Sequence, residues 1–225
     1  MAVKLWVALD LPHRDDVERM LQQLGSHRHV KVGMELFYRL GPDYVRSLAD
    51  RGYHIFLDLK CHDIPRTAGR AVAAVRDLGI EMLTLHAAGG LEMLDAARQE
   101  AGTVDLIAVT VLTSLDDAAL ADAGIRASVD DLAMAATRLA QRAGLAGVVT
   151  SAEEALELRG LWPGARLVVP GIRLMENARG DQRRVMGPRE AVERGATDLV
   201  VGRPIVEASD PAAALERFLA IIQES

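Results

Sequence analysis

The sequence is poor in several features that would direct it to particular kinds of protein. Its 225 residues contain a single cysteine, Cys61, which rules out an internal disulfide and fits a reducing compartment. No run of about 18 apolar residues occurs, so we expect no membrane-spanning helix. No basic cluster is present and the net charge is −6, which disfavours nucleic acid or an anionic membrane as a partner. These absences predict a soluble, cytoplasmic protein.

The chain also lacks signs of division into parts. No linker or low-complexity segment interrupts it, and 50% of its residues are hydrophobic. A chain of this length and apolar content can bury one large core, so we expect a single domain over residues 1–225. No Gly-x-Gly-x-x-Gly motif follows the first apolar run, which weakens the case for a dinucleotide-binding doubly wound sheet.

Short apolar runs alternate along the chain with stretches of helical periodicity. Eight runs are predicted to be strands: Leu5–Leu9, Val30–Gly33, His54–Lys60, Met82–His86, Leu106–Leu112, Gly147–Thr150, Leu167–Val169 and Leu199–Gly202. Glycines follow the helical stretches where left-handed C-caps would end them, at Gly25, Gly52, Gly79, Gly144 and Gly195. Near-continuous apolar strands are typical of a covered parallel sheet. The pattern favours a (β/α)₈ TIM barrel, with an open doubly wound sheet as the alternative.

The third predicted strand passes directly from apolar residues into charged ones. Asp58 and Lys60 are two positions apart and would point to the same face of a strand, and Asp63 follows. Pro65 ends the strand, because proline disfavours the helical conformation before it and suits the first turn of a helix. A desolvated charge costs several kcal/mol unless it is paired. The group is therefore either a structural ion pair or part of an active site.

Polar residues and glycines also lie at or near the ends of other predicted strands, where a barrel places its functional groups. They are Asp10, Lys31, His86, Thr113, Ser114, Arg173, Gly202 and Arg203. Taken singly, Lys31 could be a solvated lysine and His86 a hydrogen-bonded core histidine. Arg203 is more informative, because a guanidinium beside a glycine N–H suits a phosphate, which barrel enzymes often bind after strands 7 and 8.

Residues 58–67, Asp-Leu-Lys-Cys-His-Asp-Ile-Pro-Arg-Thr, closely resemble the signature of the orotidine 5′-monophosphate decarboxylase family. Further segments occur in the family's order and at fitting spacings, at 7–10, 31–33, 86–90, 112–114, 170–173, 181–182 and 201–205. The resemblance thus covers nearly the whole chain. It implies conversion of orotidine 5′-monophosphate (OMP) to UMP and CO₂ in pyrimidine biosynthesis, with no cofactor and no metal.

The resemblance implies roles for the charged residues. Lys60 would deliver the proton to C6 of the pyrimidine, and Asp58 would lie beside the substrate carboxylate. Lys31 would pair with Asp58 and contact the ribose. Asp63 would complete the array from the partner subunit of a homodimer.

The resemblance further implies substrate contacts outside this array. Asp10 would bind a ribose hydroxyl, and Thr113 would contact the pyrimidine amide, with Ser114 as an adjacent alternative. The other implied substrate-binding residues are Ile64, Thr67, Arg173, Gln182, Gly202 and Arg203, of which the last four match the phosphate site and its closing loop. The stretch 173–187 has little periodicity and fits a lid. Arg66 departs from the asparagine common in bacterial members.

Two other functions compete with decarboxylation of OMP. Sister enzymes resembling 3-keto-gulonate-6-phosphate decarboxylase or hexulose-phosphate synthase share a similar charged motif but use Mg²⁺. They need a glutamate where this chain has Lys31, and Glu35 is a possible substitute. A non-catalytic barrel that binds nucleotide or assembles with other chains is the second alternative, but it has no need for buried alternating charges.

Overall fold

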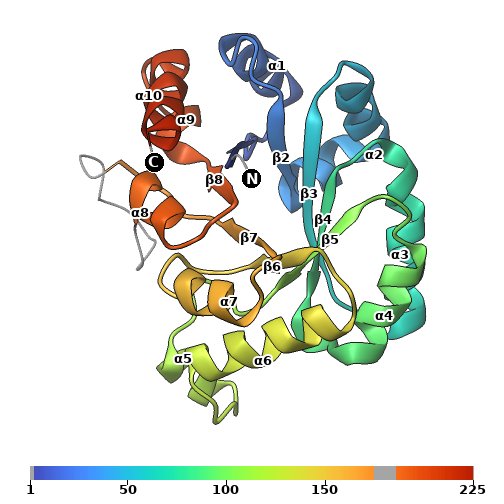
Figure 1. Ribbon diagram of the computed structural model, residues 1–225. Helices are drawn as coiled ribbons and strands as arrows, with labels where there is room; N and C mark the ends of the chain where they lie inside the picture. The colour runs from blue at the N-terminus through green and yellow to red at the C-terminus, as the bar shows by residue number, and fades with distance from the viewer. Residues whose placement is uncertain (1–2, 175–185, 225) are drawn as a thin grey trace.

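The computed structural model describes residues 3–174 and 186–224 and shows a ring of parallel strands surrounded by helices (Figure 1). The strands are β1 Lys4–Ala8, β2 His29–Gly33, β3 His54–Cys61, β4 Met82–His86, β5 Asp105–Val109, β6 Gly147–Val149, β7 Arg166–Val169 and β8 Asp198–Val201. The ring closes because β1 pairs with both β2 and β8. The predicted (β/α)₈ barrel is confirmed, and the alternative prediction of an open doubly wound sheet is wrong.

Helices follow the strands around the outside of the ring (Figure 1). They are α1 Arg14–Gln23, α2 Met34–Asp50, α3 Pro65–Val75, α4 Gly90–Glu100, α5 Asp117–Asp122, α6 Val129–Arg142, α7 Ala155–Leu161, α8 Pro188–Glu193, α9 Arg203–Val206 and α10 Pro211–Gln223, with short 3₁₀ turns η1 Arg76–Leu78 and η2 Ala87–Gly89. All five glycines predicted to end helices have φ between +60° and +96°. No helix within the described residues has the length and apolarity to cross a membrane.

The fifth strand is shorter than predicted, since it ends at Val109 rather than at Leu112. Its neighbour β6 is only three residues long. The hydroxyl of Thr110, one residue after the end of β5, donates a hydrogen bond at 3.0 Å to the carbonyl of Val149, the last residue of β6. The apolar residues Val111 and Leu112, which suggested a longer strand, line a cavity instead.

Apolar side chains fill the inside of the barrel, and a buried ion network closes its amino-terminal end. The inner cluster consists of Trp6, Ala8, Phe56, Met82, Ile107, Val168 and Val200. Below it, Arg166 reaches Asp198 at 2.5 Å, Asp105 at 2.8 Å and Glu81 at 3.0 Å. Burial alone would lower the pKa of Arg166, but its hydrogen bonds and ion pair with Asp198 raise it above its ordinary value. The closed amino-terminal end leaves the carboxyl-terminal end as the place for a site.

His29, His54 and Glu81 lie at the same closed end. Their potential ligand atoms are within 4.8 Å of one another, but the two imidazole rings stack in parallel, with centroids 4.5 Å apart and planes 9° apart. Because each imidazole lone pair lies in its ring plane, stacked rings do not direct both lone pairs at one ion. Glu81 also binds Lys4 and Arg166. Burial and the neighbouring His54 lower the pKa of His29 to about 4, so the His29 ring is neutral, and the Glu81 carboxylate is paired with Lys4 and Arg166 as part of the barrel's closure.

Candidate active site

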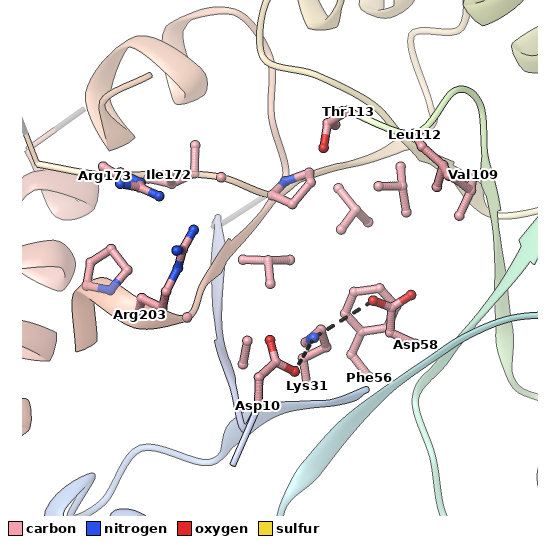
Figure 2. Close-up of a pocket in the computed structure, with 18 of the residues that line it drawn as sticks. Asp10, Lys31, Phe56, Asp58, Val109, Leu112, Thr113, Ile172, Arg173 and Arg203 are labelled. Atoms are coloured by element: carbon pink, nitrogen blue, oxygen red, sulfur yellow. Dashed lines mark hydrogen bonds and ion pairs between the residues drawn. The ribbon is translucent and has the colours of Figure 1, made fainter. Parts of the chain in front are cut away.

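A cavity of about 540 Å³ opens at the carboxyl-terminal end of the barrel (Figure 2). Its apolar surface includes Phe56, Val149, Val168 and Val200, which stand on four different strands. The cavity is also lined by most of the residues that the sequence singled out, namely Asp10, Lys31, Asp58, Lys60, Thr113, Arg173, Gly202 and Arg203. Residues distant in the sequence therefore meet at one site, as the barrel topology requires.

Four charged side chains of this cavity form an alternating chain. The Lys60 ammonium lies 2.8 Å from each carboxylate oxygen of Asp58. The Lys31 ammonium lies 3.9 Å from Asp58 Oδ2 and donates a hydrogen bond to Asp10 Oδ1 at 2.8 Å. The implied pairing of Lys31 with Asp58 is present, but the closer partner of Lys31 is Asp10. Alternation of sign offsets the desolvation of Asp58 and Lys31, whose side chains are only 15% and 10% exposed.

Gly33 has no side chain, and the space that a side chain would fill is occupied by the Asp10–Lys31 pair. A Cβ atom at Gly33 would lie 3.0 Å from Asp10 Oδ1 and 3.2 Å from Lys31 Nζ. Both distances are shorter than ordinary van der Waals contacts with carbon. The Lys-Val-Gly sequence at the end of β2 therefore supplies a cation and, two residues later, the room for its partner.

Arg173 and Arg203 lie together on the side of the cavity away from Asp58 (Figure 2). Arg173 follows β7 and is buried, whereas Arg203 begins α9 directly after Gly202 and is exposed. Two guanidinium groups at one side of a concave site suit a dianionic phosphate. Gln182 and most of the predicted lid lie outside the described residues.

Thr113 lines the cavity, and Ser114 does not. Figure 2 shows Thr113 above the cavity, in the segment that follows β5. Ser114 is exposed to solvent. Of the two alternatives that the sequence left open for the pyrimidine contact, the geometry favours Thr113.

Three of the predicted site residues do not reach the cavity of their own chain. Asp63, Ile64 and Thr67 are exposed and lie outside the cavity lining. The Asp63 carboxylate accepts a hydrogen bond from the Ile64 N–H at 2.7 Å, and Ile64 itself is 67% exposed. Within one chain, these residues face solvent beside the site.

His86 is not the hydrogen-bonded core histidine that the sequence left open as an interpretation. Its ring stacks against His62 with centroids 5.4 Å apart. Its buried Nδ1 atom has no hydrogen-bond partner among the described residues. Burial, followed by the neighbouring His62 and Lys60, lowers the pKa of His86, so the ring is a neutral neighbour of the charged chain.

Thr84 contacts the charged group and was missed by the sequence analysis. It is a fully buried residue of β4 whose hydroxyl contacts both Lys60 and Asp58. The only sequence signal was a hydroxyl within the otherwise apolar Met82–Leu85 run, which by itself has no functional meaning.

A closed parallel barrel with a charged cavity at the carboxyl ends of its strands has the architecture of a (β/α)₈ barrel enzyme. The site has cations beside carboxylates at one side and paired guanidinium groups at the other. This arrangement fits a phosphorylated substrate on which negative charge develops during the reaction.

Comparison with known proteins identifies the family. The model of the Orotidine 5′-phosphate decarboxylase / HUMPS family matches residues 3–218. Orotidine 5′-phosphate decarboxylases of Idiomarina loihiensis and Nitrosococcus oceani are 44% and 46% identical to this chain, with at least 97% of each chain covered. The crystal structure of the orotidine 5′-phosphate decarboxylase from Lactobacillus acidophilus matches with a TM-score of 0.87 and 37% identity over 99% of both chains. The chain therefore belongs to the orotidine 5′-phosphate decarboxylase / HUMPS family, which confirms the resemblance.

Proposed function

We propose that this cavity decarboxylates OMP to UMP and that Lys60 donates the proton to C6. The chain is a carboxy-lyase of pyrimidine biosynthesis, as its family and its near-full-length relatives indicate. One observation carries the assignment of roles: Lys60, Asp58, Lys31 and Asp10 alternate in sign within a single cavity.

The chemistry explains why an ammonium is needed at this position. Loss of CO₂ leaves an electron pair on C6 in the plane of the pyrimidine ring, and no adjacent carbonyl can take up that pair as an enolate. An ammonium directed at C6 stabilises the developing charge and then transfers its proton to the carbon. Lys60 is left as an amine and regains its proton from solvent, so the enzyme needs no cofactor for this step.

The other cavity residues hold the substrate around this reaction. Asp58 lies beside the substrate carboxylate, Lys31 and Asp10 bind the ribose, and Thr113 contacts the pyrimidine amide. The phosphate binds to Arg173, Arg203 and the N–H of Gly202, and Gln182, which lies outside the described residues, is a further implied contact. Phosphate binding far from the reacting bond stabilises the closed, dehydrated site, which is how a remote contact increases the rate.

Arg203→Ala is expected to raise the KM for OMP by about 10²-fold, because charge-assisted hydrogen bonds to the phosphate are lost. Steady-state kinetics with OMP measures the change. Arg189→Ala is the matched control, because Arg189 is an exposed arginine that pairs with Glu224 and lies outside the cavity. A variant at Arg203 with unchanged KM would contradict the phosphate assignment.

We also propose a homodimer in which Asp63, Ile64 and Thr67 contact the substrate bound to the partner subunit. The position of these residues supports the proposal, since they are exposed beside the site but do not line their own cavity. Ile64, which is 67% exposed and follows β3 beside the site, would be covered by the second copy in such a dimer.

Mixing inactive Lys60→Ala and Asp63→Ala proteins is expected to restore activity. A hybrid dimer holds one site with an intact Lys60 and an intact Asp63, so random exchange of subunits at equal amounts should recover about a quarter of the wild-type sites. Each variant alone is the control. Activity that stays absent after mass spectrometry has shown subunit exchange would reject the shared site.

A metal-dependent reaction of the sister enzymes is the alternative within the same family. The arrangement of donors disfavours it, because the Lys31 ammonium lies between Asp10 and Asp58 and would repel a divalent cation. Glu35, the possible substitute ligand, is exposed, pairs with Arg39 and does not line the cavity. Assays of CO₂ release from OMP and from 3-keto-gulonate 6-phosphate separate the two: turnover of OMP alone is expected, and turnover of the sugar acid alone would reject the proposal.

We further propose that residues 1–225 act as one cytoplasmic domain. The pairing of β1 with β8 supports a single domain, because the first and last strands complete the same sheet. The single free cysteine, Cys61, fits a reducing compartment.

A further inference from the structure

Strand β3 is irregular at the point where it carries the charged residues. Leu57 pairs with Leu83 of β4, but the next paired residue of β3 is Cys61, which lies opposite Leu85. Three residues of β3, Asp58 to Lys60, therefore face a single residue of β4, Thr84. Such a bulge redirects side chains and interrupts the ladder of backbone hydrogen bonds.

Lys60 has a strained backbone within this bulge. Its φ of +49° makes it the only residue other than glycine with a positive φ in the described part of the chain. A lysine in the left-handed region is uncommon and persists only where surrounding contacts hold it. The strain falls on the residue whose ammonium has to be aimed at C6.

The Thr84 hydroxyl supplies contacts that hold this geometry. It accepts a hydrogen bond from the Lys60 N–H at 2.8 Å, a donor that the interrupted ladder leaves without a β4 carbonyl. It donates its own proton to Asp58 Oδ1 at 2.9 Å, and the same oxygen accepts from the Lys60 ammonium at 2.8 Å. Thr84 is completely buried, so water cannot replace the hydroxyl without a rearrangement.

We infer that Thr84 is a positioning residue for the reaction, which holds the Lys60 backbone in its left-handed conformation and orients Asp58 against the Lys60 ammonium. The inference rests on the proposed function for the direction in which Lys60 must point. Thr84 does not itself line the cavity, so it acts through Lys60 and Asp58, the two lining residues to which it is hydrogen-bonded.

Thr84→Val is expected to lower kcat about 10²-fold, because a displacement of roughly 1 Å in a catalytic group has that effect. The KM for OMP and the affinity for UMP should change little, since the phosphate contacts are intact. Thr84→Ser keeps the hydroxyl and should restore most of kcat. Thr137→Val is the matched control, because it removes another buried threonine hydroxyl, which binds the Ala133 carbonyl within α6, and should leave kcat unchanged.

Three outcomes would overturn the inference: a Thr84→Val enzyme with wild-type kcat, a loss that Thr84→Ser does not restore, or an equal loss in Thr137→Val. If Thr84→Val does not fold, Thr84→Ala removes the hydroxyl without placing a methyl group against Asp58. An inactive wild-type protein would reject the proposed function instead. The geometric part is then tested by a crystal structure of the Thr84 variant, in which Lys60 should leave the left-handed region; an unchanged φ would refute it.

Discussion

Lys60→Ala is expected to lower kcat for OMP by about 10⁴-fold or more, because the variant loses both the charge that stabilises the carbanion and the proton that quenches it. UMP should still bind, since the arginines at the phosphate side are unchanged. Stopped assays with high enzyme concentration measure the residual rate, and calorimetric titration with UMP measures the binding.

Lys4→Ala is the matched control for this variant. The chain has only three lysines, Lys4, Lys31 and Lys60, and Lys4 pairs with Glu81 at the closed end of the barrel, far from the cavity. Its loss should affect stability slightly and leave kcat unchanged. A Lys60→Ala protein that kept more than about a tenth of wild-type kcat would show that another group supplies the proton.

Arg166→Met is expected to lower the free energy of unfolding by about 3–5 kcal/mol, because it leaves the buried carboxylate of Asp198 without its cation. Asp198 is only 1% exposed, and among the described residues it would keep the Trp6 N–H and the Thr197 hydroxyl as side-chain hydrogen-bond donors. Urea denaturation measures the loss. The kcat of the folded variant should stay near the wild-type value, because Arg166 lies at the end of the barrel opposite the cavity.

The ion pair of Arg189 with Glu224 is exposed, so a substitution of Arg189 is the control that shows how much of the Arg166 effect comes from burial. Arg189→Met should change the free energy of unfolding by no more than about 1 kcal/mol, as exposed ion pairs contribute little. Equal effects of the two substitutions would contradict the view that the Arg166 network closes the barrel.

The strands were predictable because each is a short apolar run, and the glycines that end the helices were predictable from their position. The end of β5 was not, because Val111 and Leu112 are as apolar as strand residues although they line a cavity. The limit of β5 is set by the short β6 strand beside it, which is a long-range property.

The charged site was predictable in its members but not in its geometry. Alternation along a strand predicted that Asp58 and Lys60 point the same way, and their side chains do meet. However, the backbone there does not have the regular strand geometry on which that prediction rested. It contains a bulge and a left-handed Lys60, and both depend on Thr84 of the neighbouring strand. Arg166 was missed for the same reason, since its partners come from segments far away in the sequence.

Turnover of OMP after removal of divalent cations tests the central claim most directly. The purified protein is treated with EDTA, OMP is added, and loss of the orotate chromophore is followed by ultraviolet absorbance before and after Mg²⁺ is supplied. A full rate in EDTA that Mg²⁺ does not change is the result expected if Lys60 and its neighbouring charges alone stabilise the carbanion. No turnover by folded protein, or turnover that appears only with Mg²⁺, would contradict it.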